Sequence, residues 1–253
     1  MTRSSTWSAR SSEPGRSRGV VRAQPTVVLV HSPLVGPSCR QRPAEELRAR
    51  GHAVVVPPLT EVFEAAGPFY PRLVAAVAER IEGPEPVVLA GHSGAGALLP
   101  AVVDATPAPV VASVFVDALL PHPGRSWFDT VPAQTREELR GMAVDGVLPA
   151  WDEWFPPGTV ERLVPAPGMR ARFSAELPRP PLSYFEEPAP RAPEPDPGST
   201  AYLRLSAAYA DAADQAAELG WRVAARDAHH LALMTAPAEI GAAIGELIDE
   251  LAG

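Results

Sequence analysis

Short apolar runs alternate with amphipathic segments along the first half of the chain. The apolar runs are rich in β-branched residues and are bounded by turn-forming residues, which is typical of strands buried on both faces of a parallel sheet. They predict strands over residues 26–32 ("TVVLVHS"), 52–59 ("HAVVVPPL"), from about Pro86, and over 110–119 ("VVASVFVDAL"). The intervening segments predict helices over residues 42–51, 69–83 and 96–105. Pro100 falls inside the third helix, where we expect it to cause a kink or the loss of a hydrogen bond.

This alternation stops at Pro121 and resumes near residue 200. The stretch between is rich in proline and holds short helical patches such as "AQTREELRGMA" and "GMRARFSAELP". Beyond it, the pattern predicts a strand over residues 200–206, a helix over 207–219, a strand over 221–228 and a closing helix over 237–251. Half of the aromatic residues of the chain lie in the irregular stretch, namely Trp127, Phe128, Trp151, Trp154, Phe155, Phe173, Tyr184 and Phe185.

These elements predict an α/β fold: a mostly parallel sheet flanked by helices, with a helical cap inserted after the fourth visible strand. With 253 residues the chain is long enough for one large core and an inserted subdomain. We assign the core to residues 26–120 and 199–253 and the cap to residues 121–198. Residues 1–25, rich in Arg and Ser, are predicted to be a disordered tail.

The charge is unevenly distributed, and this argues against nucleic acid as a partner. The chain has a formal charge of −8, and all 22 basic residues are arginine. Residues 1–25 hold five of these arginines and one acidic residue, so the remaining 17 basic and 29 acidic residues give the body a formal charge of −12. Phosphate recognition needs clustered basic side chains, and an acidic body lacks that attraction.

The tail and the cysteine content bear on the cell compartment. The first 25 residues lack the apolar segment of a secretory signal, and no apolar run is long enough for a membrane span. Cys39 is the single cysteine, which excludes an intramolecular disulfide and a cysteine-based zinc site; we interpret it as a small buried hydrophobe. We therefore predict a cytoplasmic protein that does not bind a membrane.

The third strand ends in "GHSGAG", a serine between small residues where the chain turns from strand to helix. In the G-x-S-x-G elbow, small neighbours permit a sharp turn that lifts a nucleophilic serine out of the sheet. Ser93 fits this position, and the amide of Gly94 would begin an oxyanion hole. Two alternatives remain open: a plain tight turn, and a dinucleotide-binding loop in which Asp117 would bind ribose, although Leu99 stands where the third glycine is expected.

Two histidines follow the last predicted strand in "DAHHLALMTAP". The carboxyl ends of parallel strands share one rim of the sheet, so a histidine there lies on the same rim as Ser93. A general base for Ser93 must lie on that rim.

From residue 26 to 252 the chain resembles the α/β-hydrolase fold, and most closely small-cap esterase and hydroxynitrile-lyase-like bacterial members. The resemblance rests on "LVHSPL", "GHSGAG", the inserted cap and "HHLALMTAP". It implies Ser93 as nucleophile and His230, seven residues before Pro237, as general base, with His229 as second choice.

The resemblance also implies a triad acid and a second oxyanion donor, and at both places this sequence departs from the pattern. The loop after the strand that follows the cap has alanines where the acid is expected, while Asp211 and Asp214 fall on the next predicted helix. Asp117, at the end of "VFVD", is the better candidate, with a turn cap as the alternative role. In the oxyanion stretch Pro33 has no N–H to donate, so the oxyanion hole would need the amide of Leu34, the hydroxyl of Ser32 or a different geometry.

We therefore predict a serine hydrolase of an ester or similar acyl bond in a small, largely apolar substrate. The substrate pocket is assigned to His31, Ser32, Trp127 and Trp154, with Trp151 and Phe155 as further aromatic candidates. No cofactor and no metal is predicted, and the partners expected are the small-molecule substrate and a second copy in a homodimer. Two other functions remain open: a lyase or cyclase of secondary metabolism that uses the same Ser-His pair for proton transfer, and an inactive ligand-binding homologue.

Overall fold

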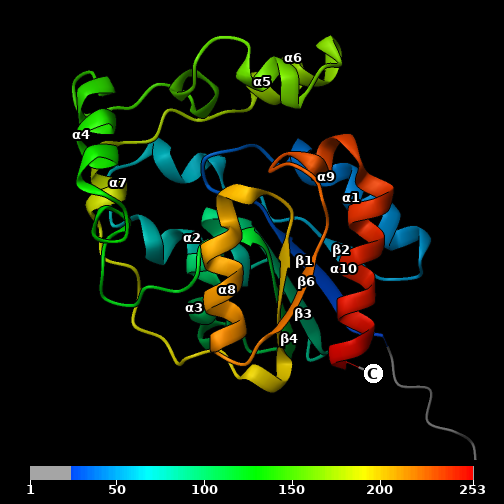
Figure 1. Cartoon of the computed structure of the whole chain (residues 1–253). Coiled ribbons are helices and arrows are strands. Elements are labelled where there is room, and N and C mark those ends of the chain that lie inside the picture. The colour runs from blue at the N-terminus through cyan, green and yellow to red at the C-terminus, as the bar shows by residue number, and fades with distance from the viewer. Residues whose placement is uncertain (1–23, 253) are drawn as a thin grey trace, which may run out of the picture.

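A parallel β-sheet forms the centre of the molecule, with helices on both faces (Figure 1). The computed structural model describes residues 24–252, so the tail predicted for residues 1–25 lies almost entirely outside the described residues. The sheet order is β2-β1-β3-β4-β5-β6, and every neighbouring pair is parallel. The strands are β1 (Thr26–Val30), β2 (Val54–Val55), β3 (Val87–Ser93), β4 (Val110–Ala118), β5 (Thr200–Arg204) and β6 (Arg222–Ala225).

Helices cover both faces of the sheet, as Figure 1 shows. The helices α1, α9 and α10 pack on one face, and α2, α3 and α8 pack on the other. Four further helices, α4 to α7, belong to the segment between β4 and β5, which we call the insertion (residues 121–198). The bounds are α1 (Ser38–Ala49), α2 (Phe69–Ala78), α3 (Leu99–Ala105), α4 (Ala133–Met142), α5 (Thr159–Leu163), α6 (Pro167–Ala175), α7 (Leu182–Glu186), α8 (Ala210–Glu218), α9 (Ala232–Thr235) and α10 (Pro237–Ala252).

The central strands bury both of their faces, which explains their continuous apolar sequences. In β1, Val28 and Val30 face the cluster beneath α2 and α3, while Val27 and Leu29 face α1 and α10. Each of these four side chains is at most 1% exposed. Burying a side chain of this size stabilises the fold by about 1.5–3 kcal/mol, so the central strands anchor both helical layers.

Three predictions that involve proline are wrong. Pro100 does not kink α3, because the helix begins at Leu99 and the proline occupies its first turn, where no N–H is needed. Helix α1 begins at Ser38, after Pro37, and Pro43 lies inside it rather than at its start. Strand β2 keeps only Val54 and Val55 of the predicted residues 52–59, because the two prolines that follow cannot donate to a ladder.

The insertion is fixed to the core by two carboxylates that accept hydrogen bonds from helix N-termini. Glu187, at the end of α7, accepts from the amides of Phe69 and Tyr70 at 2.6 and 2.8 Å, at the start of α2. Glu176, at the end of α6, accepts from the amide of Ser38 at 2.9 Å, at the start of α1. Each carboxylate satisfies N–H groups that have no partner within their own helix.

The contact of Glu187 with α2 gives a stability prediction. Glu187→Ala leaves two amides without their charged acceptor, so we expect the free energy of unfolding to fall by about 1–3 kcal/mol in chemical denaturation. Glu186→Ala is the matched control, because the neighbouring Glu186 pairs with Arg140 at 3.2 Å where both side chains are largely exposed, and such pairs contribute about 0–1 kcal/mol. Equal stability of the two variants would show that the contact contributes nothing.

Candidate active site

Ser93 is the last residue of β3 and has a backbone conformation that few non-glycine residues adopt. Its φ is 57° and its ψ is −129°, and the chain turns directly into the 3₁₀ helix η2 (Gly94–Leu98). This turn places the half-buried side chain at the carboxyl end of the sheet. Strain of this kind persists only where the surroundings impose it, and it is common at reactive residues.

The small residues around Ser93 are explained by close packing. A Cβ on Gly96 would collide with the carbonyl oxygen of Leu119, in the chain that leaves β4. The same chain is held by a hydrogen bond of 3.0 Å from the amide of Leu119 to the carbonyl oxygen of Ser93. The lack of a side chain at Gly96 therefore lets the chain after β4 pass close to the elbow. This packing accounts for the glycine without a phosphate ligand.

Asp117 occupies a bulge in β4, and this bulge directs its side chain. Val116 pairs with His92 and Ala118 pairs with Ser93, so Asp117 is an extra residue without a partner on β3. Its φ is 44°, again in the left-handed region. Bulges of this kind redirect side chains next to functional sites.

The carboxylate of Asp117 is fully buried and accepts four hydrogen bonds. The donors are the amides of Leu205 and Ser206 at 2.9 and 3.0 Å, the hydroxyl of Ser206 at 2.7 Å, and Nδ1 of His230 at 2.7 Å. Burial alone would raise the pKa of Asp117, but the hydrogen bonds and charge of His230 and the bonds from Ser206 outweigh it and lower the pKa. Asp117 is therefore ionised at neutral pH. It caps the turn after β5 and not the turn that directly follows Asp117 itself.

The contact with Asp117 distinguishes between the two candidate histidines. Because the carboxylate only accepts, Nδ1 of His230 carries the proton and Nε2 keeps the lone pair of a base. Nε2 of His229 instead lies 3.0 Å from the hydroxyl of Thr235. Asp211 and Asp214 are exposed on α8, as expected.

The ring of His230 stacks on two other rings. The centroid distance to His92 is 4.4 Å, and Nε2 of His92 donates to the carbonyl oxygen of His230 at 2.9 Å. The ring of Tyr209 is stacked on His230 at 5.0 Å with an interplanar angle of 5°. The hydroxyl of Tyr209 is 3.4 Å from Oγ of Ser93. Among residues 24–252, Ser93 has no hydrogen bond to His230, and apo sites often tighten only when substrate binds.

Sequence reasoning missed both stacking partners. His92 lies inside the elbow motif but has no role in the motif. Tyr209 lies at the carboxyl end of β5, in the loop where only a carboxylate was sought, and its position on the same rim as Ser93 was the one available signal.

The oxyanion region contains Ser32 next to Gly94. The side chain of Ser32 is 2% exposed, and a Cβ on Gly94 would be 3.2 Å from its Oγ. The amide of Leu34 donates to this oxygen at 3.3 Å. Within the described chain the hydroxyl proton of Ser32 has no acceptor of its own, which leaves it available for an oxygen beside Gly94.

His31 does not reach the pocket that we predicted for it. Its side chain is fully buried, Nδ1 donates to the carbonyl oxygen of Ser32 at 2.8 Å, and Nε2 accepts from the amide of Leu59 at 3.2 Å. Burial, assisted by the charge of Arg40, lowers its pKa to about 4. His31 therefore supports the loop after β1 as a neutral imidazole.

The tryptophans of the insertion differ in their distance from His230. Trp127 and Trp154 pack on Phe185 with centroid distances of 5.3 and 5.8 Å, in the aromatic cluster of the insertion. Trp151 is the tryptophan next to the site, with its ring centroid 6.2 Å from that of His230. It also packs on Phe155, at 4.8 Å.

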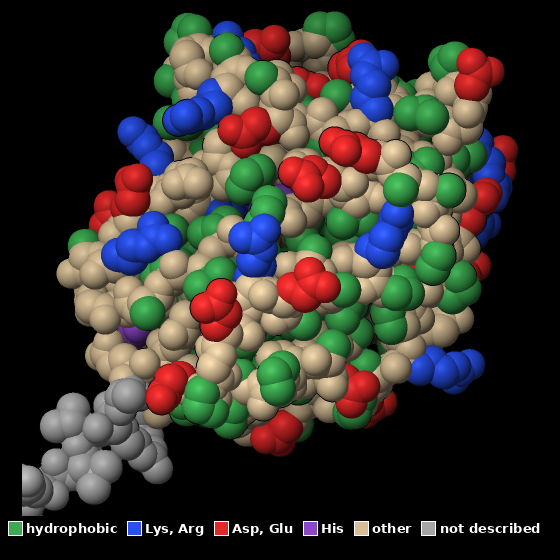
Figure 2. Space-filling model, turned by 180° about the vertical axis from the view of Figure 1, so that it is seen from behind, with side chains coloured by type: hydrophobic (Ala, Val, Ile, Leu, Met, Phe, Trp, Pro, Cys, Tyr) green, Lys and Arg blue, Asp and Glu red, His purple; other side chains and the backbone are tan. Residues whose placement is uncertain are grey.

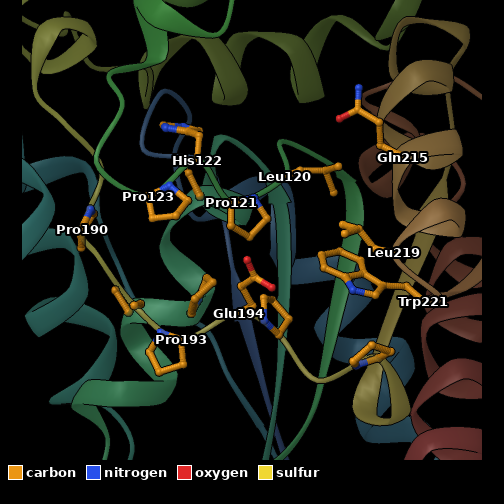
Figure 3. Close-up of a pocket in the computed structure, with 16 residues that line it drawn as sticks. Leu120, Pro121, His122, Pro123, Pro190, Pro193, Glu194, Gln215, Leu219 and Trp221 are labelled. Atoms are coloured by element: carbon orange, nitrogen blue, oxygen red, sulfur yellow. The ribbon is translucent and has the colours of Figure 1, made fainter.

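A separate cavity of about 290 Å³ lies between α3, α8 and the loop that precedes β5 (Figure 3). Neither Ser93 nor His230 lines it. Its walls are mostly proline and other apolar residues, with Glu194 as the acidic side chain; the labelled lining residues are Leu120, Pro121, His122, Pro123, Pro190, Pro193, Glu194, Gln215, Leu219 and Trp221. The cavity is therefore distinct from the candidate active site.

Charged side chains of both signs are spread over the surface. On the face shown in Figure 2, basic side chains are interspersed with acidic ones and form no continuous basic patch. In the described part of the chain, no three His, Cys, Asp or Glu side chains gather as a metal site would require. No helix among residues 24–252 is long and apolar enough to cross a membrane.

Comparison with known proteins finds similarity at the level of structure. No family model and no curated protein sequence matches the chain. An extracellular α/β-hydrolase from a Paenibacillus species is similar, with 20% identity, a TM-score of 0.66, and coverage of 88% of this chain and 98% of that one. A pyrethroid hydrolase from Sphingobium faniae JZ-2 has 22% identity, a TM-score of 0.62 and coverage of 90% and 98%. Tomato methylketone synthase I, in complex with β-ketoheptanoate, has 14% identity, a TM-score of 0.66 and coverage of 90% and 98%.

The buried His31 gives a prediction for the pH dependence of stability. The unfolded chain protonates this ring near the ordinary pKa of 6.5, whereas the folded chain does so only near 4, so acid in this window favours unfolding. His31 alone is expected to remove about 2 kcal/mol of stability between about pH 7 and pH 5. His31→Gln should make the free energy of unfolding less dependent on pH in this range, as urea titrations would show. The same pH slope in both proteins would rule out this role for His31.

Proposed function

Because the chain has the α/β-hydrolase fold, we propose that it is a serine hydrolase that cleaves an ester or similar acyl bond. The observation that carries this proposal is the pair formed by Asp117 and His230, with Nδ1 and Oδ2 2.7 Å apart, on the same rim as the strained Ser93. Similar structures that are named as hydrolases add support at the level of the fold.

The geometry supports a two-step reaction. Ser93 Oγ attacks the acyl carbon and forms the new C–O bond, while Nε2 of His230 takes the serine proton. The same proton then passes to the leaving oxygen as the original C–O bond breaks. Water, deprotonated by His230, releases the acyl group as a carboxylic acid and restores Ser93.

Asp117 acts by fixing the tautomer of His230 and stabilising the imidazolium formed in each step. A carboxylate held by three further hydrogen bonds cannot move away as the charge develops. In the comparable triad of serine proteases, loss of this carboxylate lowers kcat by about 10⁴.

The proposed oxyanion hole combines the amide of Gly94 with the hydroxyl of Ser32. Pro33 removes the usual second amide, and the amide of Leu34 donates to Oγ of Ser32, which orients that hydroxyl beside Gly94. The negative oxygen of the tetrahedral intermediate would then receive one amide and one hydroxyl.

We assign a small, largely apolar acyl substrate to the site, with the insertion as its cap. Trp151 beside His230 provides an aromatic wall, and the neighbouring cluster of Trp127, Trp154 and Phe185 is apolar. No cofactor is required by this mechanism.

One observation favours a second candidate, a lyase or cyclase that uses Ser93 and His230 for proton transfer without an acyl-enzyme. The hydroxyl of Ser93 is hydrogen-bonded to Tyr209 and not to His230. This arrangement suits a serine that forms a hydrogen bond with a substrate oxygen better than a serine that attacks an acyl carbon. Two features of the sequence also favour this candidate: the absence of an acid in the loop after β5, for which Asp117 beside His230 could substitute, and Pro33 in the oxyanion stretch.

Covalent labelling with a fluorophosphonate, detected by intact mass, tests the hydrolase against the lyase. We expect one adduct on the native protein, none on Ser93→Ala, and labelling at least about 100-fold slower on His230→Ala because the serine then lacks its base. His229→Ala is the matched control and should label at the native rate, since His229 bonds Thr235 and not Asp117. A folded native protein that forms no adduct would overturn the hydrolase proposal and support the lyase.

A second prediction concerns Ser32, measured on the best ester found in a screen of short acyl esters. Removing the hydroxyl in Ser32→Ala should lower kcat by about 100-fold with little change in KM, because the oxyanion forms only after binding. Ser38→Ala, a serine at the start of α1 whose hydroxyl forms no hydrogen bond in the described chain, should retain native kcat. A native kcat in Ser32→Ala would exclude the hydroxyl as a donor.

A further inference from the structure

Tyr209 provides a hydroxyl at the reacting centre that the proposed mechanism does not use. The residue ends the 3₁₀ turn η6 (Ala207–Tyr209), directly after the segment that Asp117 holds through Leu205 and Ser206. Its hydroxyl is the hydrogen-bond partner of Ser93 Oγ, at 3.4 Å. The carboxylate that orients His230 therefore also fixes the turn that carries Tyr209.

The sheet order determines the side from which this hydroxyl approaches Ser93. Ser93 ends β3, Ser32 follows β1 on one side of β3, and Tyr209 follows β5 on the other. His230 follows β6, beyond β5, and its ring is parallel to that of Tyr209. Ser32 and Tyr209 thus follow strands on opposite sides of the nucleophile, and Tyr209 is on the side of the base.

The chemistry of acyl transfer determines which substrate oxygen lies on the side of Ser93 that carries Tyr209. The carbonyl oxygen points to the oxyanion donors, and the leaving oxygen must face the histidine that protonates it. A hydroxyl beside both Ser93 Oγ and the ring of His230 lies next to the leaving oxygen, and later next to the attacking water.

Tyr209 is also in the protonation state that donation requires. Burial and the charge of Asp117 raise its pKa to about 12, even though the contact with Ser93 lowers it. The phenol keeps its proton across the working range of an ordinary enzyme.

We propose that Tyr209 is a further catalytic residue, whose hydroxyl donates a hydrogen bond to the leaving oxygen and thereby extends the substrate class to esters of unactivated alcohols. This inference rests on the proposed hydrolase function. As the acyl C–O bond breaks, negative charge grows on the leaving oxygen, and the Tyr209 O–H stabilises it until His230 delivers the proton that came from Ser93. Tyr209 retains its own proton throughout.

The stacked ring of Tyr209 has a related effect on the base. When His230 becomes an imidazolium, its charge lies parallel to an electron-rich phenol face at a centroid distance of 5.0 Å. Such contacts favour the cationic form. The ring and the hydroxyl can be separated experimentally, because Tyr209→Phe keeps the first and removes the second.

The test compares two esters of the same acyl chain, one with an ethyl and one with a p-nitrophenyl leaving group. Ethoxide is a poor leaving group and needs the hydrogen bond, whereas p-nitrophenolate departs without help. We expect Tyr209→Phe to lower the single-turnover acylation rate about 10- to 100-fold for the ethyl ester and less than about 3-fold for the p-nitrophenyl ester. Tyr70→Phe, which removes the hydroxyl of a tyrosine on α2 that is 2% exposed, is the matched control and should leave both rates unchanged.

The outcomes separate this inference from the function on which it rests. Equal losses with both esters would mean that Tyr209 only positions Ser93 or His230, and faster reaction of Tyr209→Phe would mean that the hydroxyl obstructs Ser93; both overturn the inference. Fluorophosphonate labelling of the native protein isolates the parent proposal. If the native protein is labelled and the leaving-group effect is absent, only the role of Tyr209 fails, while an unlabelled native protein overturns both.

Discussion

A fully buried carboxylate must be paired, and the pairing of Asp117 organises the rim of the sheet that carries Ser93 and His230. Its four hydrogen bonds connect β4 to the turn after β5 and to the loop after β6, three segments distant in sequence. Leaving such a charge without partners would cost several kcal/mol, so the positions of Ser206 and His230 are strongly determined. The bulge in β4 makes this possible, because it points one residue of an otherwise buried strand along the rim rather than into a helical layer.

The positions of the main elements could be predicted from the sequence because each depends on local pattern. Continuous β-branched runs identified the central strands, and a serine between small residues identified the elbow. The histidine was found because the carboxyl ends of parallel strands share one edge, so sequence position after a strand translates into spatial position. The same reasoning favoured Asp117 as the acid but left its turn-capping role open. The structure shows it bonding to His230 and to the next turn with one carboxylate.

The remaining features depend on pairing between distant segments, which no local pattern encodes. The bulge at Asp117 exists only in relation to the register of β3, and the stack of Tyr209 on His230 joins the loops after two different strands. His31 was placed in the pocket because it lies in the oxyanion stretch, yet its buried ring bonds Leu59 from another loop. Strand β2 is short because Pro57 and Pro58 have no N–H to donate to a ladder. Helix α1 begins at Ser38, so Pro43 lies inside it, and the sequence alone did not show which proline precedes its start.

The attachment of the insertion restricts how the insertion can move relative to the sheet. Glu176 binds the N-terminus of α1 on one face of the sheet, and Glu187 binds the N-terminus of α2 on the other face. The insertion is thus attached to helices on both faces of the sheet, and Figure 1 shows it above the sheet. Apolar packing adds to these contacts, because Val164 and Phe173 of the insertion share a buried cluster with Leu231 of the core. Any motion that lifts the whole insertion away from the sheet must therefore break contacts with both helical layers.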